Sequence, residues 1–130
     1  MAAAIATLPG FREGKQFLRP NALVLFQPVL DNNPNDGYGY ERVKENYKNY
    51  SPAHHVTSEV PPTILYGGTT DTAAKLPALR RFRDNMKAAG NKCILLEFEG
   101  KHGFINKPDI RPKILKAADE FLMDLGFLGD

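Results

Sequence analysis

Cysteine is almost absent from this sequence of 130 residues, in which Cys93 stands alone. A single cysteine excludes an internal disulfide bond and fits a reducing compartment. Charge of one sign is also scarce, because 17 basic and 15 acidic residues leave a net charge of +2. So small an imbalance gives no reason to expect binding to nucleic acid or to an anionic membrane surface.

The sequence also lacks internal repeats, low-complexity tracts and long apolar runs. It begins MAAAIATLPG, which has no positively charged start and is interrupted at Pro9 and Gly10. No stretch reaches the roughly 18–20 apolar residues that a membrane-spanning helix needs. We therefore expect no signal peptide, no membrane span and a cytoplasmic location.

Short apolar runs alternate with amphipathic segments along the rest of the chain. The runs end near glycine, proline or asparagine, which is typical of strands that lead into turns. The expected strands span residues 22–29, 62–68 and 93–98. The expected helices span residues 1–7, 40–50, 73–89 and 109–125, with polar loops over 11–20 and 31–40.

The two longest helices are predicted from apolar stripes at helical spacing. The stripe in 73–89 consists of Leu76, Leu79, Phe82 and Met86, and Gly90 follows where a helix commonly ends. The stripe in 109–125 consists of Ile114, Leu115, Ala118, Phe121, Leu122 and Leu125. Strands that alternate with such helices predict the α/β class, with about three parallel strands and covering helices, in one domain over residues 1–130.

Two reactive side chains follow neighbouring strands in this scheme. Asp71 lies in GGTTDT after the second strand, and His102 lies in EGKHGF after the third. The carboxyl ends of parallel strands meet at one edge of the sheet, where open α/β folds bind ligands. Neighbouring strands run about 5 Å apart, so a hydrogen bond between Asp71 and His102 is within reach. A carboxylate on Nδ1 orients the imidazole and stabilises the imidazolium that forms during proton transfer.

The same polar residues also have a structural interpretation. Histidine between glycines is common in solvated turns, and aspartate is a frequent turn former, so spacing alone leaves both interpretations open. Tyr38 and Tyr40, in NDGYGY, would either line a substrate pocket beside the site or pack in an ordinary turn. His54 and His55 are adjacent but have no cluster of further ligands, so we expect no metal site there.

Several stretches, in their order, resemble the C-terminal half of an α/β-hydrolase of the esterase and lipase group, near its acetyl-esterase-like members. PNALVLFQPVLDN resembles the strand before the acid-bearing strand, and YSPAHHV followed by PPTILYGGTTD resembles the acid strand and its turn. FRDNMKAAGNKCILLEFEGKHGF resembles the helix, the last strand and the histidine loop. The resemblance implies that Asp71 is the acid and His102 the base of a catalytic triad. Asp31, after the first strand, is the alternative acid, because some relatives take the acid from that position.

The chain departs from this family at the nucleophile. The family's serine lies in G-x-S-x-G on a sharp turn between strand and helix, and no such motif occurs here. The serines are Ser51, which matches a structural position, and Ser58, in a polar linker. Cys93 begins an apolar strand, where a buried thiol is inert. Thr69 and Thr70 flank the predicted acid but lie in no such turn.

The opening MAAAIATLPGF resembles the helix that follows the serine turn in that family. We therefore expect Met1 to be an internal methionine of a longer hydrolase, whose first half is missing from this chain. The longer protein would hydrolyse small acyl esters, such as acetylated sugars, without a cofactor. The chain by itself would be inactive.

A second hypothesis is a non-catalytic α/β module that binds a partner or forms oligomers. A sheet cut from a larger one has an unpaired edge, and the strand expected over 22–29 is strongly apolar. We expect this edge to be covered by a second copy of the chain or by the missing half. No nucleic acid or membrane partner is expected.

Overall fold

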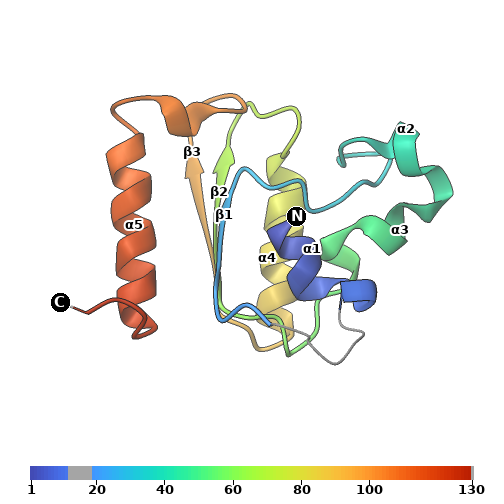
Figure 1. Cartoon of the computed structure of the whole chain (residues 1–130). Helices are drawn as coiled ribbons and strands as arrows, with labels where there is room; N and C mark the ends of the chain where they lie inside the picture. The colour runs from blue at the N-terminus through green and yellow to red at the C-terminus, as the bar shows by residue number, and fades with distance from the viewer. Residues whose placement is uncertain (12–18, 130) are drawn as a thin grey trace.

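Residues 1–11 and 19–129, which the computed structural model describes, contain one sheet of three parallel strands (Figure 1). The strands are β1 (Leu23–Phe26), β2 (Thr63–Gly68) and β3 (Cys93–Phe98), in that order across the sheet. The predicted α/β class with parallel strands is thereby confirmed. Most of the loop expected over residues 11–20 lies outside the described residues.

Helices cover both faces of the sheet (Figure 1). On one face lie α1 (Ala2–Thr7) and α4 (Leu76–Ala88), and on the other lies α5 (Arg111–Asp124). The connections carry short helical segments, which are η1 (Pro9–Phe11), α2 (Tyr40–Val43), η2 (Lys44–Asn46), α3 (Tyr47–Tyr50), η3 (Pro52–His54) and η4 (Phe104–Asn106). Of the helices in the described residues, none combines the length and the apolar character that a membrane crossing requires.

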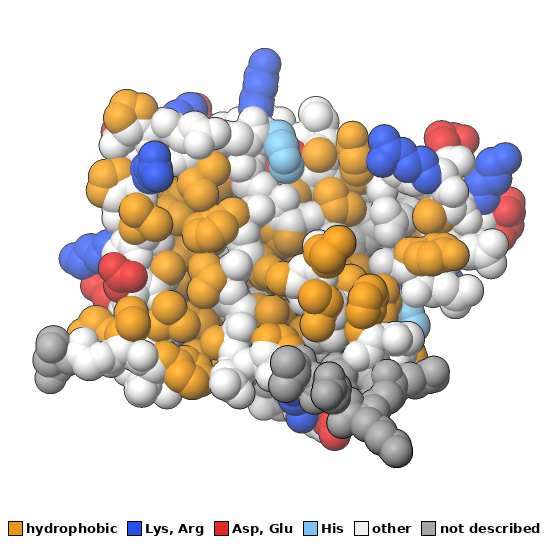
Figure 2. Space-filling model, viewed as in Figure 1, with side chains coloured by type: hydrophobic (Ala, Val, Ile, Leu, Met, Phe, Trp, Pro, Cys, Tyr) orange, Lys and Arg blue, Asp and Glu red, His pale blue; other side chains and the backbone are white. Residues whose placement is uncertain are grey.

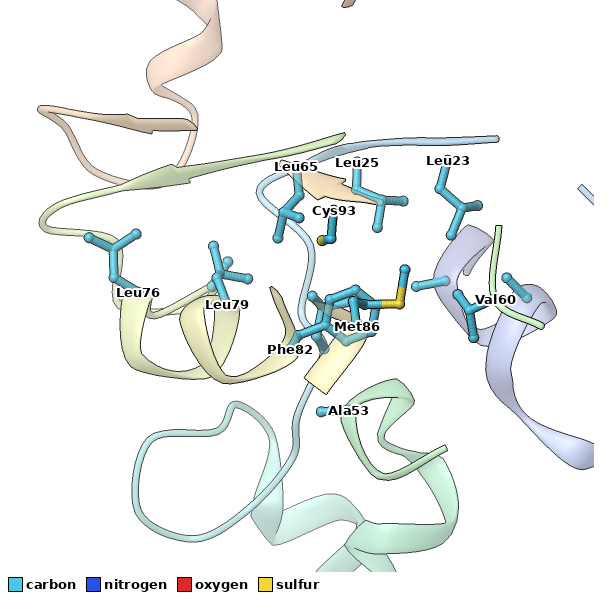
Figure 3. Packing of buried hydrophobic residues seen from close by; sticks show 14 residues of the cluster. Leu23, Leu25, Ala53, Val60, Leu65, Leu76, Leu79, Phe82, Met86 and Cys93 are labelled. Carbon is cyan, nitrogen blue, oxygen red and sulfur yellow. The ribbon is translucent and has the colours of Figure 1, made fainter. Parts of the chain in front are cut away.

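Alternating side chains of the strands form one apolar cluster on each face of the sheet. On the face of α4, Leu65 packs with Phe82 and Met86, which point from the helix toward the strands (Figure 3). On the other face, the fully buried Tyr66 packs with Ile114, and its hydroxyl donates to the Ile114 carbonyl at 2.9 Å. Burial of each large apolar side chain contributes about 1.5–3 kcal/mol, so both helices are held firmly against β2.

Both long helices end at a glycine with a left-handed backbone. After α4, Gly90 has φ +82°, and the N–H of Asn91 donates to the carbonyl of Met86 at 2.9 Å. After α5, Gly126 has φ +76° and Phe127 makes the equivalent bond. This arrangement satisfies carbonyls at the helix end and favours glycine, which has no Cβ to clash. The helix end predicted at Gly90 is confirmed.

The first strand and the segment after its loop differ from the prediction. The strand expected over 22–29 ends at Phe26, because Gln27 has φ +47°. Although the strand is strongly apolar, its Phe26 is 43% exposed. The helix expected over 40–50 is broken into α2, η2 and α3, because Lys44 has φ +45° and interrupts the helical backbone.

The long helices also differ in smaller respects. α4 begins at Leu76 rather than at residue 73, with Pro77 in its first turn, where the missing N–H costs no hydrogen bond. On α5, Leu115 is 47% exposed, so its place in the predicted stripe is wrong. Ile114 and Ala118 face the sheet, and Leu115 lies about 100° around the helix from Ile114.

Candidate active site

Asp71 lies in the turn that follows β2. Its N–H donates to the carbonyl of Gly68 at 3.2 Å, and its Oδ1 accepts the N–H groups of Ala73 at 2.8 Å and Ala74 at 2.9 Å. The side chain is 0% exposed, so these donors take the place of water around the carboxylate. Aspartate suits this position because its short side chain reaches the N–H groups two and three residues ahead.

The loop after β3 is held against the Asp71 turn by backbone contacts. The N–H of Thr69 donates to the carbonyl of Phe98 at 2.9 Å, and that of Thr70 to the carbonyl of Gly100 at 3.0 Å. A Cβ at Gly68 would lie 2.4 Å from the carbonyl oxygen of Gly100, so glycine is required where the two backbones meet. The acid turn and the histidine loop therefore form one unit at the carboxyl edge of the sheet.

His102 and Asp71 meet across this unit. Nδ1 of His102 lies 2.9 Å from Oδ2 of Asp71, and the histidine side chain is 55% exposed while the aspartate is buried. An ionised carboxylate accepts a hydrogen bond from a protonated Nδ1, which leaves the lone pair of the neutral ring on Nε2. A ring in this tautomer is suited to take a proton from an attacking hydroxyl.

The surroundings of Asp71 favour its charged form. Burial is the largest influence and by itself raises the pKa of this carboxyl. The hydrogen bonds from Ala73, His102 and Ala74 outweigh burial, so the pKa is lowered overall. At neutral pH the carboxylate is therefore ionised, as it must be to hold the imidazole and to stabilise an imidazolium.

Gln27 belongs to the same cluster, although sequence reasoning missed it. It follows β1 and is 7% exposed. Its Nε2 donates to Oδ2 of Asp71 at 3.0 Å and to the carbonyl of Lys101 at 3.1 Å, and its Oε1 accepts the N–H of Gly103 at 2.7 Å. The available signal was a lone amide in the apolar run LVLFQPV. Its positive φ costs about 1 kcal/mol.

Asp31, the alternative acid, is engaged in a separate ion-pair cluster. Its Oδ2 accepts from Arg81 at 2.9 Å, and its Oδ1 accepts the N–H of Asn33 at 3.0 Å and lies 3.4 Å from Nε2 of His54. Burial acts most strongly and raises the pKa of Asp31, but the bonds from Arg81 and Asn33 lower it overall. The structure thus pairs His102 with Asp71 rather than with Asp31.

Tyr38 and Tyr40 are not among the residues that line the hollow beside His102. The hollow beside His102 is lined by Thr70, Glu99, Gly100, Lys101, Gly103, Phe104 and Lys107. Tyr38 is 44% exposed in the loop after β1, and Tyr40 packs with its ring centre 6.0 Å from that of Tyr47. Neither tyrosine lines this hollow, and a place for Tyr38 and Tyr40 in a substrate pocket stays a prediction.

The two adjacent histidines have separate partners. His54 faces the carboxylate of Asp31, whereas Nε2 of His55 lies 2.8 Å from the carbonyl oxygen of Lys48. Within residues 1–11 and 19–129, no group of three or more His, Cys, Asp or Glu side chains is arranged to hold a metal ion. His54 and His55 therefore do not form a metal site with other side chains of these residues.

Neither serine is placed to act with His102. Ser51 is fully buried, its hydroxyl donates to the carbonyl of Tyr47 at 2.6 Å, and its oxygen accepts the N–H of Asn32 at 2.9 Å. Ser58 lies beside Lys92, which precedes β3, so it is at the amino edge of the sheet. His102 lies at the opposite, carboxyl edge.

The other candidate nucleophiles are no better placed. Burial is the largest influence on Cys93 and raises the pKa of its thiol to about 12, so the thiol stays protonated at the start of β3. Thr70 lines the hollow beside His102. In the described part of the chain, however, the imidazole hydrogen-bonds to Asp71 alone.

Solved structures of an esterase from the planctomycete Thermogutta terrifontis are similar to this chain. Esterase 2 of that organism, phosphoramylated by tabun, aligns over 98% of this chain with a TM-score of 0.83 and 35% sequence identity. Its butyrate-bound form aligns over 98% with a TM-score of 0.80 and 33% identity. This chain covers 52% and 53% of those two chains, about half the length of the esterase. No protein-family model and no curated protein matches the chain.

Proposed function

We propose that this chain, which has the α/β-hydrolase fold of an esterase and corresponds to its C-terminal half, supplies the acid and the base of a serine carboxylesterase. The predicted resemblance to the C-terminal half of an α/β-hydrolase and the predicted α/β fold are both confirmed. The observation that carries the proposal is the 2.9 Å contact between Nδ1 of His102 and Oδ2 of Asp71 at the carboxyl edge of the sheet. The nucleophile is proposed to come from outside this sequence, which contains no G-x-S-x-G.

In the proposed reaction, the proton moves through His102. Its Nε2 takes the hydroxyl proton as the serine oxygen attacks the ester carbonyl, and returns it to the leaving alcohol. Asp71 keeps Nδ1 protonated and stabilises the imidazolium between the two transfers. The serine and the donors that bind the oxyanion act together with this pair, so the chain by itself does not turn over esters. The reaction requires no cofactor.

Esters of short acyl groups are the proposed substrates. The esterase from Thermogutta terrifontis has been solved with butyrate and with propionate bound, and this supports, by similarity, a site for short acyl groups in the hydrolase proposed here. Acetyl esters of sugars are the finer proposal, in line with the resemblance to acetyl-esterase-like hydrolases. A cytoplasmic location is proposed with them, in keeping with the single cysteine. Hydrolysis rates that increase steadily with acyl length would contradict the short acyl site.

The coding DNA upstream of Met1 provides the first test. We expect an in-frame G-x-S-x-G there, and its absence would contradict the proposal. Protein translated from the longer frame should hydrolyse p-nitrophenyl butyrate. His102→Ala and Asp71→Asn should each lower kcat on the order of 10³–10⁴-fold. His55→Ala, a histidine outside the pair, is the matched control and should leave kcat unchanged.

The chain without that extension tests whether the nucleophile lies elsewhere. We expect its rate with p-nitrophenyl butyrate to equal the buffer rate and to be the same in His102→Ala. Turnover by the chain that disappears in His102→Ala would mean that a nucleophile lies within these 130 residues. That result would overturn the division of the triad between this sequence and the rest of the fold.

A partner at the outer edge of β1 is part of the proposal. Among the described residues β1 pairs with β2 alone. The N–H groups of Leu23 and Gln27 point to β2, so the backbone groups of Val24 and Phe26 point away from the sheet. Phe26 is also exposed. In the view of Figure 2, hydrophobic side chains gather over the region of β1 and α1. We propose that a strand of the remaining half of the hydrolase fold pairs here, with a second copy of the chain as the rival occupant.

Sedimentation of the chain by itself tests this edge. We expect self-association at micromolar concentration, or binding of a hydrophobic dye, because the edge lacks its strand. Phe26→Glu should abolish either property, whereas Phe127→Glu, which changes a residue that is 50% exposed after α5, should not. A strictly monomeric chain that binds no dye would contradict an uncovered edge. Association that survives in the longer protein would instead favour the non-catalytic oligomeric module.

A further inference from the structure

We infer that Gln27 is a positioning residue, whose side-chain amide holds the carboxylate of Asp71 and the loop of His102 in one arrangement. A role of Gln27 in catalysis rests on the proposed function, whereas its hydrogen bonds are all formed within this chain. Three segments far apart in sequence meet at this amide, since 44 residues separate Gln27 from Asp71 and 76 separate it from Gly103.

The partners of the amide fix its orientation. Nε2 faces two acceptors, Oδ2 of Asp71 at 3.0 Å and the carbonyl of Lys101 at 3.1 Å. Oε1 faces one donor, the N–H of Gly103 at 2.7 Å. A reversed amide would place its oxygen against both acceptors and its NH₂ against the N–H, so only this orientation satisfies the group.

Gln27 contacts the backbone on both sides of His102. Lys101 and Gly103 are the residues immediately before and after His102, and the amide bonds to the backbone of each. The same amide donates to Oδ2 of Asp71, the oxygen that also faces Nδ1 of His102. Gln27, which directly follows β1 and is 7% exposed, therefore sets the place of the imidazole relative to the carboxylate.

The backbone of Gln27 adopts a conformation that its residue type does not favour. Its φ is +47°, and it precedes Pro28, before which residues are normally extended with negative φ. Its N–H still donates to the carbonyl of Tyr66 at 3.0 Å, so the position remains attached to β2. Glycine would relax this backbone but would lose all three side-chain bonds. The strain is thus maintained at a position where an amide connects the acid to the base.

The tautomer of the His102 ring tests this inference. If Gln27 only stabilised the fold, replacing it would leave the tautomer unchanged. Nitrogen-15 NMR of the ring reports which nitrogen carries the proton, and His102→Asn assigns the signals among the three histidines. In the unmodified chain, the neutral ring should be protonated mainly at Nδ1, which faces Asp71. In Gln27→Leu and in Gln27→Gly, the ratio of the Nδ1–H to the Nε2–H tautomer should fall about tenfold or more, as expected for the loss of a hydrogen bond to a charged group.

Two controls and the second Gln27 variant make the result decisive. Asp71→Asn sets the ratio for a ring without its carboxylate, and Asn85→Leu removes a side-chain bond to the carbonyl of Ala53, outside the cluster. Gln27→Gly suits a backbone at positive φ, so it decides the question if Gln27→Leu does not fold, as judged by circular dichroism. A ratio in the folded Gln27 variants equal to that of Asn85→Leu would overturn the inference. The measurement involves no ester, so it stands even if the longer protein proves inactive.

Discussion

Arg81→Met should remove much of the pH dependence of stability in acid. The Arg81 guanidinium donates to Asp36 at 2.8 and 2.9 Å and to Asp31 at 2.9 Å. Its hydrogen bond is the largest influence on Asp36. Together with the hydrogen bond from Asn33 and the charge of Arg81, it outweighs burial and lowers the pKa of that carboxyl from 3.8 to about 2. A carboxyl whose pKa is lower in the folded than in the unfolded state stabilises the fold above about pH 4. This stabilisation is lost as the pH falls toward about 2.

The structure also gives the size of the effect. Lowering the pKa from 3.8 to about 2 corresponds to about 2.5 kcal/mol. Arg81 is 39% exposed, so solvent screening reduces this contribution to about 1–2 kcal/mol. The variant also leaves the buried Asp31 without its charged donor, which costs about another 1–2 kcal/mol. We expect Arg81→Met to lower the free energy of unfolding by about 2–4 kcal/mol near pH 7, and the difference to approach zero near pH 2.

Urea denaturation at several pH values between about 7 and 2 measures this difference. Arg80→Met is the matched control, because Arg80 lies on the same helix but bonds to Glu97 on the exposed surface, at 2.6 and 2.7 Å. The control should change the free energy of unfolding little at any pH, since exposed ion pairs contribute little. A difference for Arg81→Met that stays constant with pH, or that equals the control, would mean that Arg81 does not lower the pKa of Asp36.

Two further predictions concern the packing on either side of β2. Tyr66→Phe removes the hydroxyl that donates to the Ile114 carbonyl, and should lower the free energy of unfolding by about 1 kcal/mol in urea denaturation. An unchanged midpoint and slope would contradict that bond. Phe82→Ala empties a site that is 0% exposed beneath the sheet, and should cost about 3–5 kcal/mol by the same measurement. A cost below about 1 kcal/mol would mean that Phe82 is not part of the core.

Much of the fold could be predicted because its signals are local. Leu76, Leu79, Phe82 and Met86 recur at helical spacing, and all lie on the buried side of α4. Asp71 and His102 could be paired in advance because each follows a strand, and neighbouring parallel strands end at the same edge. The glycines beside them also indicated tight loops, as the contact between Gly68 and Gly100 shows.

What could not be predicted depends on backbone conformation or on distant partners. The positive φ of Gln27 shortens β1, and that of Lys44 breaks the helix expected over 40–50, although neither residue type favours such a backbone. The role of Gln27 depends on the backbone of a loop 74 and 76 residues away. The sequence allows Asp31 as the acid, because its ion-pair partner Arg81 lies 50 residues away along the chain. The spacing of residues along the sequence cannot predict such contacts.

The rate of p-nitrophenyl butyrate hydrolysis by protein from the longer reading frame, measured beside His102→Ala, decides whether His102 acts as the base. We expect measurable turnover in the parent and a fall on the order of 10³–10⁴-fold in kcat in the variant, with little change in KM. Turnover that His102→Ala leaves intact, or a folded parent that hydrolyses no ester, would contradict the assignment of His102 and Asp71 as base and acid.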